Sequence, residues 1–314
     1  MKHYTFIDYA TQGYIALVGL LIALLHNETV PDWKWLLAAH VVCSGLVHGL
    51  INLASARPVN RVLDLLRHFY PVLLYTGFYR ETGVLSQMFH VGHLDAVFID
   101  LDQKLFGFQP SLVWMLKLPY VWISEIFYFS YFSYYLMIGG TGLALFIRDR
   151  KQFYHYVCVV SFVFYGCYLI YIFLPVIGPR IIYSGIAPFD PPAEVLPVEQ
   201  WVFPDAVQSG LFYNLMHLIY HYFETEGAAF PSSHVAIALV TAYFSFRYLP
   251  RIRWIHLVMA ILLCLSTVYC RYHYAVDVLG GVLTTALLLP VGNWLYRRYG
   301  GEVKPGVANQ TARS

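Results

Sequence analysis

Eight stretches of the chain are mostly apolar, and polar residues separate them. A membrane-spanning helix needs about 20 such residues, because the hydrocarbon layer is about 30 Å thick and a helix rises about 1.5 Å per residue. The pattern therefore predicts eight helical spans. They cover residues 10–26, 33–55, 68–85, 119–147, 154–175, 234–250, 253–270 and 276–297.

Two regions depart from this pattern. Residues 86–118 mix acidic residues with hydrophobic ones, which favours an interfacial amphipathic segment or a re-entrant hairpin over a span. The connection 176–233 is long and acidic, with Arg180 as its only basic residue, and 206–223 within it predicts an apolar interfacial helix. Because plain connections of this length are uncommon, we expect a lid or a substrate-recognition element here.

The composition supports a membrane protein. Apolar residues make up 59% of the chain and charged residues 12%, and the mean hydropathy is +0.56. A soluble domain has about 45–50% apolar and about 25% charged residues, so this surplus of apolar residues does not fit one soluble core. The prediction is an all-α polytopic membrane bundle.

The net charge of +2 gives no sign of a nucleic-acid partner. The five cysteines include no CxxC pair, which indicates that they are buried small side chains.

The distribution of basic residues predicts the orientation of the chain. Counting alternate connections, fourteen of the 20 Lys and Arg residues fall on one side and six on the other. Since basic residues collect in cytoplasmic loops, both termini are expected in the cytoplasm and the long loop on the extracytoplasmic side. Arg57, Arg61 and Arg67 then serve as topology determinants.

Three places distant in the sequence carry polar residues at span ends on the extracytoplasmic side. They are Arg180 after the fifth span, the Pro-Ser-Ser-His segment 231–234 that opens the sixth, and the turn 271–277 between the seventh and eighth. Polar groups at membrane depth are costly, so such groups are default candidates for function.

Some of these residues suit an anion. The planar forks of Arg180 and Arg271 match phosphate oxygens. Ser232 and Ser233 open a helix, where free backbone N–H groups and the helix dipole favour negative charge.

The histidines add acid–base and nucleophilic chemistry. His273 and Asp277 are four residues apart, so on a helix they share one face, and the carboxylate can fix the imidazole tautomer. His234 can supply a second imidazole as proton donor. An anion cradle, a nucleophile, an orienting carboxylate and a proton donor together indicate phosphoryl transfer.

The three segments resemble the motifs of the type 2 phosphatidic acid phosphatase superfamily. Segment 231–234 resembles its Pro-Ser-Gly-His motif, segment 273–281 resembles its His-x-x-x-Asp motif, and Arg180 after Gly178-Pro179 resembles the arginine of its first motif. The resemblance covers roughly 119–297, and the order and placement of the motifs agree with it.

The resemblance implies a six-helix phosphatase-type core and a phosphohistidine mechanism without metal or other cofactor. His273 would attack phosphorus, Asp277 would orient His273, and His234 would protonate the leaving oxygen. The implied ligands of the phosphoryl oxygens are Arg180, Arg271, Ser232 and Ser233.

The motifs also depart from the family pattern. Phe173 stands where the first motif has a lysine, and Ser266 and Thr267 stand where the third has a serine–arginine pair. Arg271 lies two residues before His273 instead. This variant resembles the inositol-phosphorylceramide-synthase and sphingomyelin-synthase side of the superfamily, which transfers head groups between lipids.

We therefore expect an integral-membrane enzyme that cleaves a lipid phosphate or phosphodiester at the extracytoplasmic face. Head-group transfer to a lipid or alcohol acceptor stays open. From another class, a non-enzymatic lipid-binding protein or transporter also stays open, although the internal repeats and midplane charges of transporters are not seen in the sequence. The expected parts are two accessory spans in 1–67, a catalytic core in 68–297 and a polar cytoplasmic tail in 298–314.

Two further polar features have two interpretations each. Glu125 lies about six residues into the fourth span, about 9 Å deep, where it meets a substrate hydroxyl or pairs with an arginine. His217 and His221, with Glu224 nearby, have the spacing of a helical metal site or mark the wet face of an interfacial helix. We favour the second interpretation and expect no metal in the site.

Overall fold

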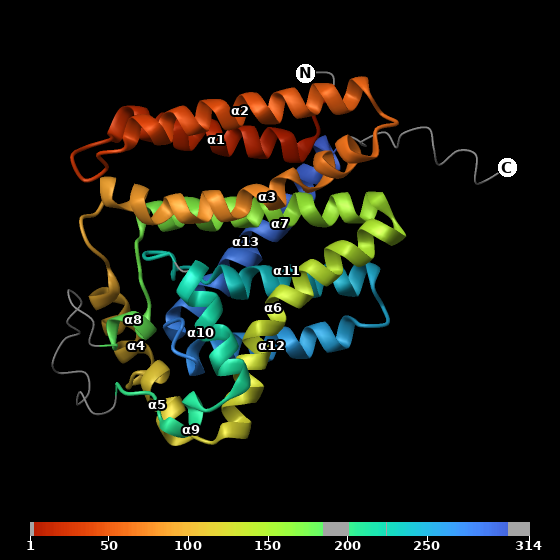
Figure 1. The fold of residues 1–314 in the computed structure, drawn as a ribbon. Coiled ribbons are helices and arrows are strands. Elements are labelled where there is room, and N and C mark those ends of the chain that lie inside the picture. Colours follow the sequence, from red (N-terminus) through yellow and green to blue (C-terminus); the bar gives the residue numbers. More distant parts are fainter. Residues whose placement is uncertain (1–2, 185–200, 224, 301–314) are drawn as a thin grey trace.

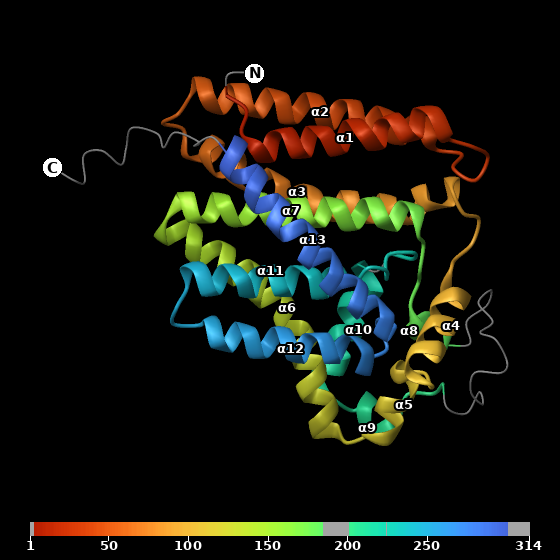
Figure 2. The ribbon, with the colours of Figure 1, turned by 180° about the vertical axis from the view of Figure 1, so that it is seen from behind.

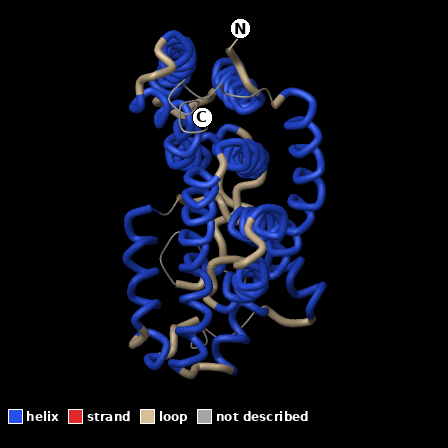
Figure 3. The backbone as a smooth tube through the Cα atoms, turned by 90° about the vertical axis from the view of Figure 1, so that its right-hand side faces the viewer, coloured by secondary structure: helices blue, strands red, loops and turns tan. Residues whose placement is uncertain are grey.

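The computed structural model describes residues 3–184, 201–223 and 225–300 as an assembly of helices (Figures 1 and 3). Apart from an isolated bridge between Val176 and Ala228, no β structure occurs in these ranges. The predicted all-α class is confirmed. The proline-rich half of the long loop and nearly all of the predicted polar tail fall outside the described residues.

Each of the eight predicted spans corresponds to a helix. Five of them, α1, α2, α6, α7 and α13, are long and apolar enough to cross a membrane. The helices α11 and α12 have 16 and 17 residues, and α3 carries several charges. The eight are α1 (Phe6–Leu25), α2 (Trp33–Ala56), α3 (Arg61–Leu85), α6 (Val121–Arg148), α7 (Arg150–Phe173), α11 (Ser233–Tyr248), α12 (Arg253–Tyr269) and α13 (Ala275–Tyr299).

Short helices fill the regions where no span was predicted. The segment 86–118 forms a short 3-10 helix and two α-helices, and 206–223 lies mostly within one helix, as its pattern predicts. Figures 1 and 2 show α4, α5, α8 and α9 together at the end of the bundle opposite the C-terminal end of α13. The short helices are η1 (Ser86–Met88), α4 (Asp95–Phe106), α5 (Pro110–Lys117), α8 (Pro179–Ile182), α9 (Asp205–Gln208) and α10 (Leu211–Phe223).

The centre of the bundle is α7, which packs against α1, α3, α6, α11 and α13. In the most apolar 18-residue stretch of α7, 72% of the residues are buried. The corresponding share for α2 is 17%, and α2 lies at the edge of the bundle (Figures 1 and 2). A helix that is apolar all round is buried in protein or in lipid. We conclude that α7 is surrounded by protein and that α2 exposes apolar side chains on the outside of the bundle.

A buried ion pair joins the first helices to the rest of the bundle. Asp8 of α1 and Arg67 of α3 form a salt bridge, and their exposed fractions are 0% and 3%. Asp8 also accepts hydrogen bonds from the Thr5 backbone and from the Tyr70 hydroxyl, at 2.7 Å each. The interpretation of Arg67 as a topology determinant is therefore corrected, because its charge is satisfied inside the protein.

The first helix also contributes to the main apolar core. Val18 and Ile22 of α1 belong to the same buried cluster as Val160 of α7 and Val240 of α11. The division at residue 67 into accessory and catalytic parts remains a prediction, and α1 packs as part of the bundle.

We predict that Asp8→Ala destabilises the protein by about 3–5 kcal/mol, because it leaves the Arg67 guanidinium buried without its partner. Thermal unfolding of the purified protein in detergent measures this change. Asp32→Ala is the matched control, because Asp32 is exposed and makes no side-chain capping bond. Equal melting temperatures for the two variants would contradict the importance of the pair.

Candidate active site

The three motif segments meet at one end of the bundle. The Ser232 amide donates to the Asp277 carbonyl at 3.1 Å, and the Ala229 amide donates to the Val176 carbonyl at 2.7 Å. Gly178 has φ +102°, and a Cβ there would lie 2.7 Å from the Tyr272 carbonyl oxygen. The loop before Arg180 therefore approaches the turn before His273 so closely that only glycine fits.

His273 and Asp277 form the pair that their spacing predicts. Nδ1 of His273 lies 3.3 Å from Oδ2 of Asp277, and the exposed fractions of the two residues are 3% and 0%. The Tyr274 amide donates to the same Oδ2 at 2.9 Å. The carboxylate is thus fixed by the first turn of α13 and in turn orients the imidazole.

His234 faces this pair from the first turn of α11. The ring centroids of His234 and His273 are 5.7 Å apart, with the rings at 60°. The His234 ring also contacts Tyr131 and Tyr134 of α6, at 4.9 and 4.6 Å between centroids. The imidazole at the start of α11 and the imidazole of the turn before α13 therefore lie side by side.

A tight turn between α12 and α13 presents His273. The Thr267 carbonyl accepts the amides of Tyr272 and His273, at 3.0 Å each, and Arg271 has φ +61°. A left-handed backbone at a non-glycine residue costs about 1–2 kcal/mol, and such strain clusters at functional sites. Burial lowers the pKa of His273 well below its usual range, His234 adds to this, and a hydrogen bond with the Ala229 backbone opposes it. At neutral pH His273 is a neutral imidazole.

Arg271 is directed away from the histidines and toward the segment that precedes α9. Its Nη1 donates to the Trp201 carbonyl, and its guanidinium lies 4.7 Å from the centre of the Phe203 ring. Burial lowers the pKa of Arg271 to about 10, so the group keeps its charge at neutral pH. Its expected contact with phosphate remains a prediction.

The two serines are integrated into the start of α11. The Ser232 hydroxyl caps the helix by accepting the Val235 amide at 3.3 Å. The Ser233 amide donates to the Tyr171 hydroxyl at 3.2 Å, and this hydroxyl donates to the Pro231 carbonyl at 3.0 Å. The capping role is thus visible, and the phosphate-binding role predicted for both serines is compatible with it.

Arg180 lies beside two tyrosine rings and a polar cavity. Its guanidinium carbon is 5.2 Å from the centre of the Tyr220 ring and 5.9 Å from that of Tyr272. A cavity of about 310 Å³ is lined by Arg180, Tyr220 and three polar residues. Those three are His217, His221 and Glu226.

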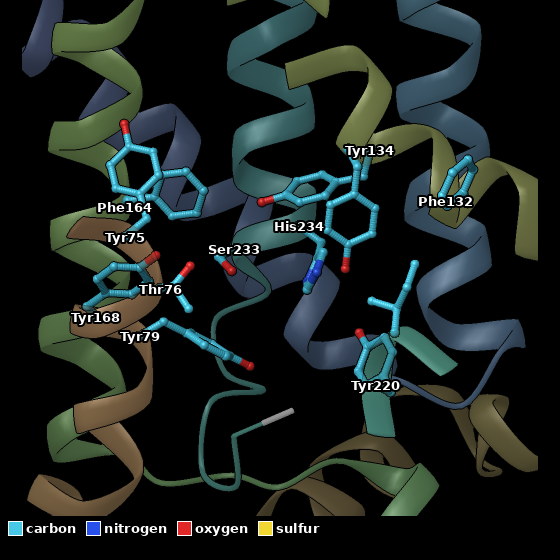
Figure 4. A pocket seen from close by; sticks show the side chains of 12 residues that line it. Tyr75, Thr76, Tyr79, Phe132, Tyr134, Phe164, Tyr168, Tyr220, Ser233 and His234 are labelled. Atoms are coloured by element: carbon cyan, nitrogen blue, oxygen red, sulfur yellow. The ribbon is translucent and has the colours of Figure 1, made fainter. Parts of the chain in front are cut away.

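A second, aromatic cavity of about 450 Å³ reaches His234 and Ser233. Figure 4 shows these two side chains with the tyrosines and phenylalanines around them. Tyr220 lines both cavities. The other lining residues are Tyr75, Thr76, Tyr79, Phe132, Tyr134, Tyr135, Phe164, Tyr168 and Ile219.

Glu125 accepts hydrogen bonds from the backbone at the start of α10. Its carboxylate accepts the Phe212 amide at 3.0 Å and the Tyr213 amide at 3.3 Å. Helix starts leave such amides without partners, and a carboxylate also suits the helix dipole. The substrate contact expected of Glu125 remains a prediction, and the carboxylate already has backbone donors.

His217 and His221 are exposed on α10 and border the polar cavity. Within the described ranges, no group of three or more His, Cys, Asp or Glu residues is placed to hold a metal ion. Glu224, the acidic residue considered with them, lies outside those ranges.

Sequence reasoning missed two aspartates of α4 that contact the motif segments. Asp95 accepts hydrogen bonds from Ile177, Gly178 and Tyr274, and Asp102 accepts the first amides of α13. Their spacing of seven residues could have indicated a shared role, because it places both side chains on one face of a helix.

Comparison with known proteins agrees with the motif resemblance. The sequence pattern of the PAP2 superfamily matches residues 97–291. A PA-phosphatase related-family protein of Dictyostelium discoideum is 35% identical over 66 residues, which are 21% of this chain and 12% of that protein. The chain thus spans about an eighth of that relative's length. No solved structure matches significantly.

We predict that Gly281→Ala disrupts the junction of α11 and α13. A Cβ at Gly281 would lie 2.6 Å from the Ser232 carbonyl oxygen and 2.9 Å from Cβ of Val235, so the helices must separate. Overpacking of this kind costs about 1–3 kcal/mol. The measurement is thermal unfolding in detergent.

Gly45→Ala in α2 is the matched control, since nothing lies within 4 Å of a Cβ at that position. Unchanged stability of both variants would show that the two helices do not need this close approach.

Proposed function

Because the chain belongs to the PAP2 superfamily, we propose that it is an integral-membrane enzyme that cleaves a lipid phosphate or phosphodiester through a phosphohistidine intermediate. The observation that carries this proposal is the pairing of His273 with Asp277 opposite His234, at 5.7 Å between the two imidazole rings. A phosphoryl group between two imidazoles can be attacked by one while the other protonates the leaving oxygen.

The first step forms a bond between Nε2 of His273 and phosphorus. Asp277 holds Nδ1–H, which leaves the lone pair of Nε2 available, and burial keeps the imidazole neutral. As the phosphorus–oxygen bond of the substrate breaks, the leaving oxygen takes a proton from His234, which enters this step as the imidazolium and leaves it as the neutral imidazole. The lipid product departs and His273 carries the phosphoryl group.

The second step regenerates the enzyme. Water attacks the phosphoryl group, His234 accepts the proton that the water loses, and the bond between His273 and phosphorus breaks. Nδ1 of His234 has no hydrogen-bond partner among the described residues. This supports a proton-transfer role for His234, because the neighbouring rings of Tyr131 and Tyr134 contact the imidazole while its Nδ1 stays available.

Arg180, Arg271, Ser232 and Ser233 are the proposed ligands of the phosphoryl oxygens. Arg180 is supported by its place beside Tyr272, the neighbour of His273, and Ser233 by its place in the wall of the aromatic cavity. Arg271 would have to release the Trp201 carbonyl to reach a phosphate oxygen. Preorganised cations and N–H donors stabilise the charge that develops during transfer.

The lipid class of the substrate is supported by the aromatic cavity next to His234. Apolar chains fit a cavity lined mainly by aromatic side chains, and the phosphoryl group would sit at its polar end. The basic-residue count supports an active site on the extracytoplasmic face with both termini in the cytoplasm.

Head-group transfer is the second candidate function, and the polar cavity beside Arg180 favours it. This cavity of about 310 Å³ adjoins the aromatic one at Tyr220 and offers His217, His221 and Glu226 to a hydroxylated acceptor. An acceptor hydroxyl would then replace water in the second step.

The test is mass spectrometry of products from wild type and His273→Ala, each given phosphatidic acid, a polyprenyl diphosphate and phosphodiester lipids, with and without alcohol and ceramide acceptors. We expect dephosphorylated lipid and free phosphate from wild type alone. A new head-group-bearing lipid that requires an acceptor would assign transfer instead. Identical profiles from both proteins would favour a lipid-binding protein or transporter.

The same assay includes a strong chelator. The proposed steps use protein side chains only, so turnover should persist. Turnover that is lost and then restored by Zn²⁺ would favour a metal at His217 and His221.

We predict that Asp277→Asn lowers turnover by about 10²–10⁴-fold while the protein stays folded, because the imidazole loses its orienting carboxylate. Asp100→Asn is the matched control, since Asp100 is exposed and forms a surface ion pair with Lys104. Rates and melting temperatures are measured for both. Near-normal turnover of the Asp277 variant would remove this residue from the mechanism.

A further inference from the structure

The buried face of helix α4 carries two carboxylates beside two apolar side chains. Its buried residues are Asp95, Phe98, Ile99 and Asp102, which share one face, while Val97 and Leu105 are exposed. Burying a charged group is costly unless donors satisfy it. The buried aspartates therefore require partners, and the hydrogen bonds that they accept from the described residues come from the motif segments.

Asp95 links the loop before Arg180 to the turn that carries His273. Its Oδ2 accepts the Ile177 amide and its Oδ1 accepts the Gly178 amide, each at 2.9 Å. The Tyr274 hydroxyl donates to the same Oδ1 at 2.9 Å. One carboxylate thus joins the first motif to the third.

Asp102 caps the helix that begins directly after His273. Its two oxygens accept the amides of Ala275 and Val276, at 2.9 Å each. These are the first amides of α13, which have no partner within the helix. Tyr274, the residue before the helix, makes no side-chain capping bond to them, so the cap comes from α4.

Between the two carboxylates, Phe98 contacts the remaining motif. Its ring centroid lies 4.7 Å from that of Phe230, which precedes Pro231, and 6.4 Å from that of Tyr274. A single face of α4 therefore touches the segments that carry Arg180, His234 and His273.

We propose that Asp95 and Asp102 are positioning residues of the active site, which hold the Arg180 loop and the His273 turn in register for phosphoryl transfer. This inference rests on the proposed function. Neither residue needs to touch the substrate. Burial raises the pKa of both carboxyl groups, and the backbone amides that donate to them oppose the shift. The ionised form is the one that these donors stabilise.

The sharpest variant is Tyr274→Phe, which removes one hydroxyl and breaks only the link from Asp95 to the His273 turn. Asp102→Asn replaces one of the two acceptor oxygens at the start of α13 by an NH₂ group that faces an amide. Because a displacement of about 1 Å can cost about 10²-fold in rate, we expect kcat to fall about 10- to 100-fold in both. KM should stay within about twofold.

Asp95→Asn should lower kcat in the same way and also raise KM, because it releases the loop that carries Arg180. The assay uses the lipid of the product panel that wild type converts fastest. Tyr274→Phe and Asp95→Asn combined should lower kcat by less than the product of the single effects, since they break one shared bond.

Two controls separate positioning from stability. Asp100→Asn on the exposed side of α4 should keep wild-type kcat and KM. Val18→Ala removes a buried apolar side chain of α1, in a different apolar cluster from α4, so it should lower the melting temperature while the folded protein keeps its kcat.

Wild-type kcat in Tyr274→Phe and Asp102→Asn would overturn the positioning role. So would an equal loss of kcat in a Val18→Ala protein whose melting temperature is lowered to the same value as theirs. The proposed function fails separately, if His273→Ala keeps its turnover. Inactive His273→Ala with fully active α4 variants would leave the function intact and reject this inference alone.

Discussion

The arrangement of the site depends on the hydrogen bonds that satisfy the backbone amides of two buried chain segments. The loop before Arg180 and the start of α13 lie inside the protein, where an amide without a partner is costly. Asp95 and Asp102 of α4 supply these partners, with four amide hydrogen bonds of 2.9 Å. Since the start of α11 is bonded to the Asp277 carbonyl, the positions of all three motif segments are tied to one short helix.

The same burial determines the chemistry that the histidines offer. A desolvated imidazole remains neutral at neutral pH, so His273 has a lone pair to use, and Asp277 fixes which nitrogen carries it. The aromatic cavity beside His234 and the polar cavity beside Arg180 meet at Tyr220. This division is the basis of the proposed lipid substrate.

Two structural features correct the view from the sequence, for a common reason. Arg67 looks like a loop charge that sets topology, yet it is buried against Asp8, 59 residues earlier in the chain. The aspartates of α4 look like polar residues of an interfacial segment, yet they bind backbone amides of the motif segments. In each case the partner is distant in sequence, and the hydropathy of the chain does not indicate which buried donor or acceptor a charged side chain contacts.

The sequence by itself determined the eight long helices, the short helices at 86–118 and 206–223, and the family. Spans and interfacial segments follow from local hydropathy because the bilayer tolerates only backbone that is satisfied within the segment. The spacing of four residues also indicated that His273 and Asp277 pair, although the contact joins the turn before α13 to the first turn of that helix and does not run along one helix face. Only the tertiary structure decided that His234 faces them, that Arg271 points toward Trp201, and that α4 caps α13. These depend on how helix ends from separate parts of the chain approach one another, and no local pattern encodes those distances.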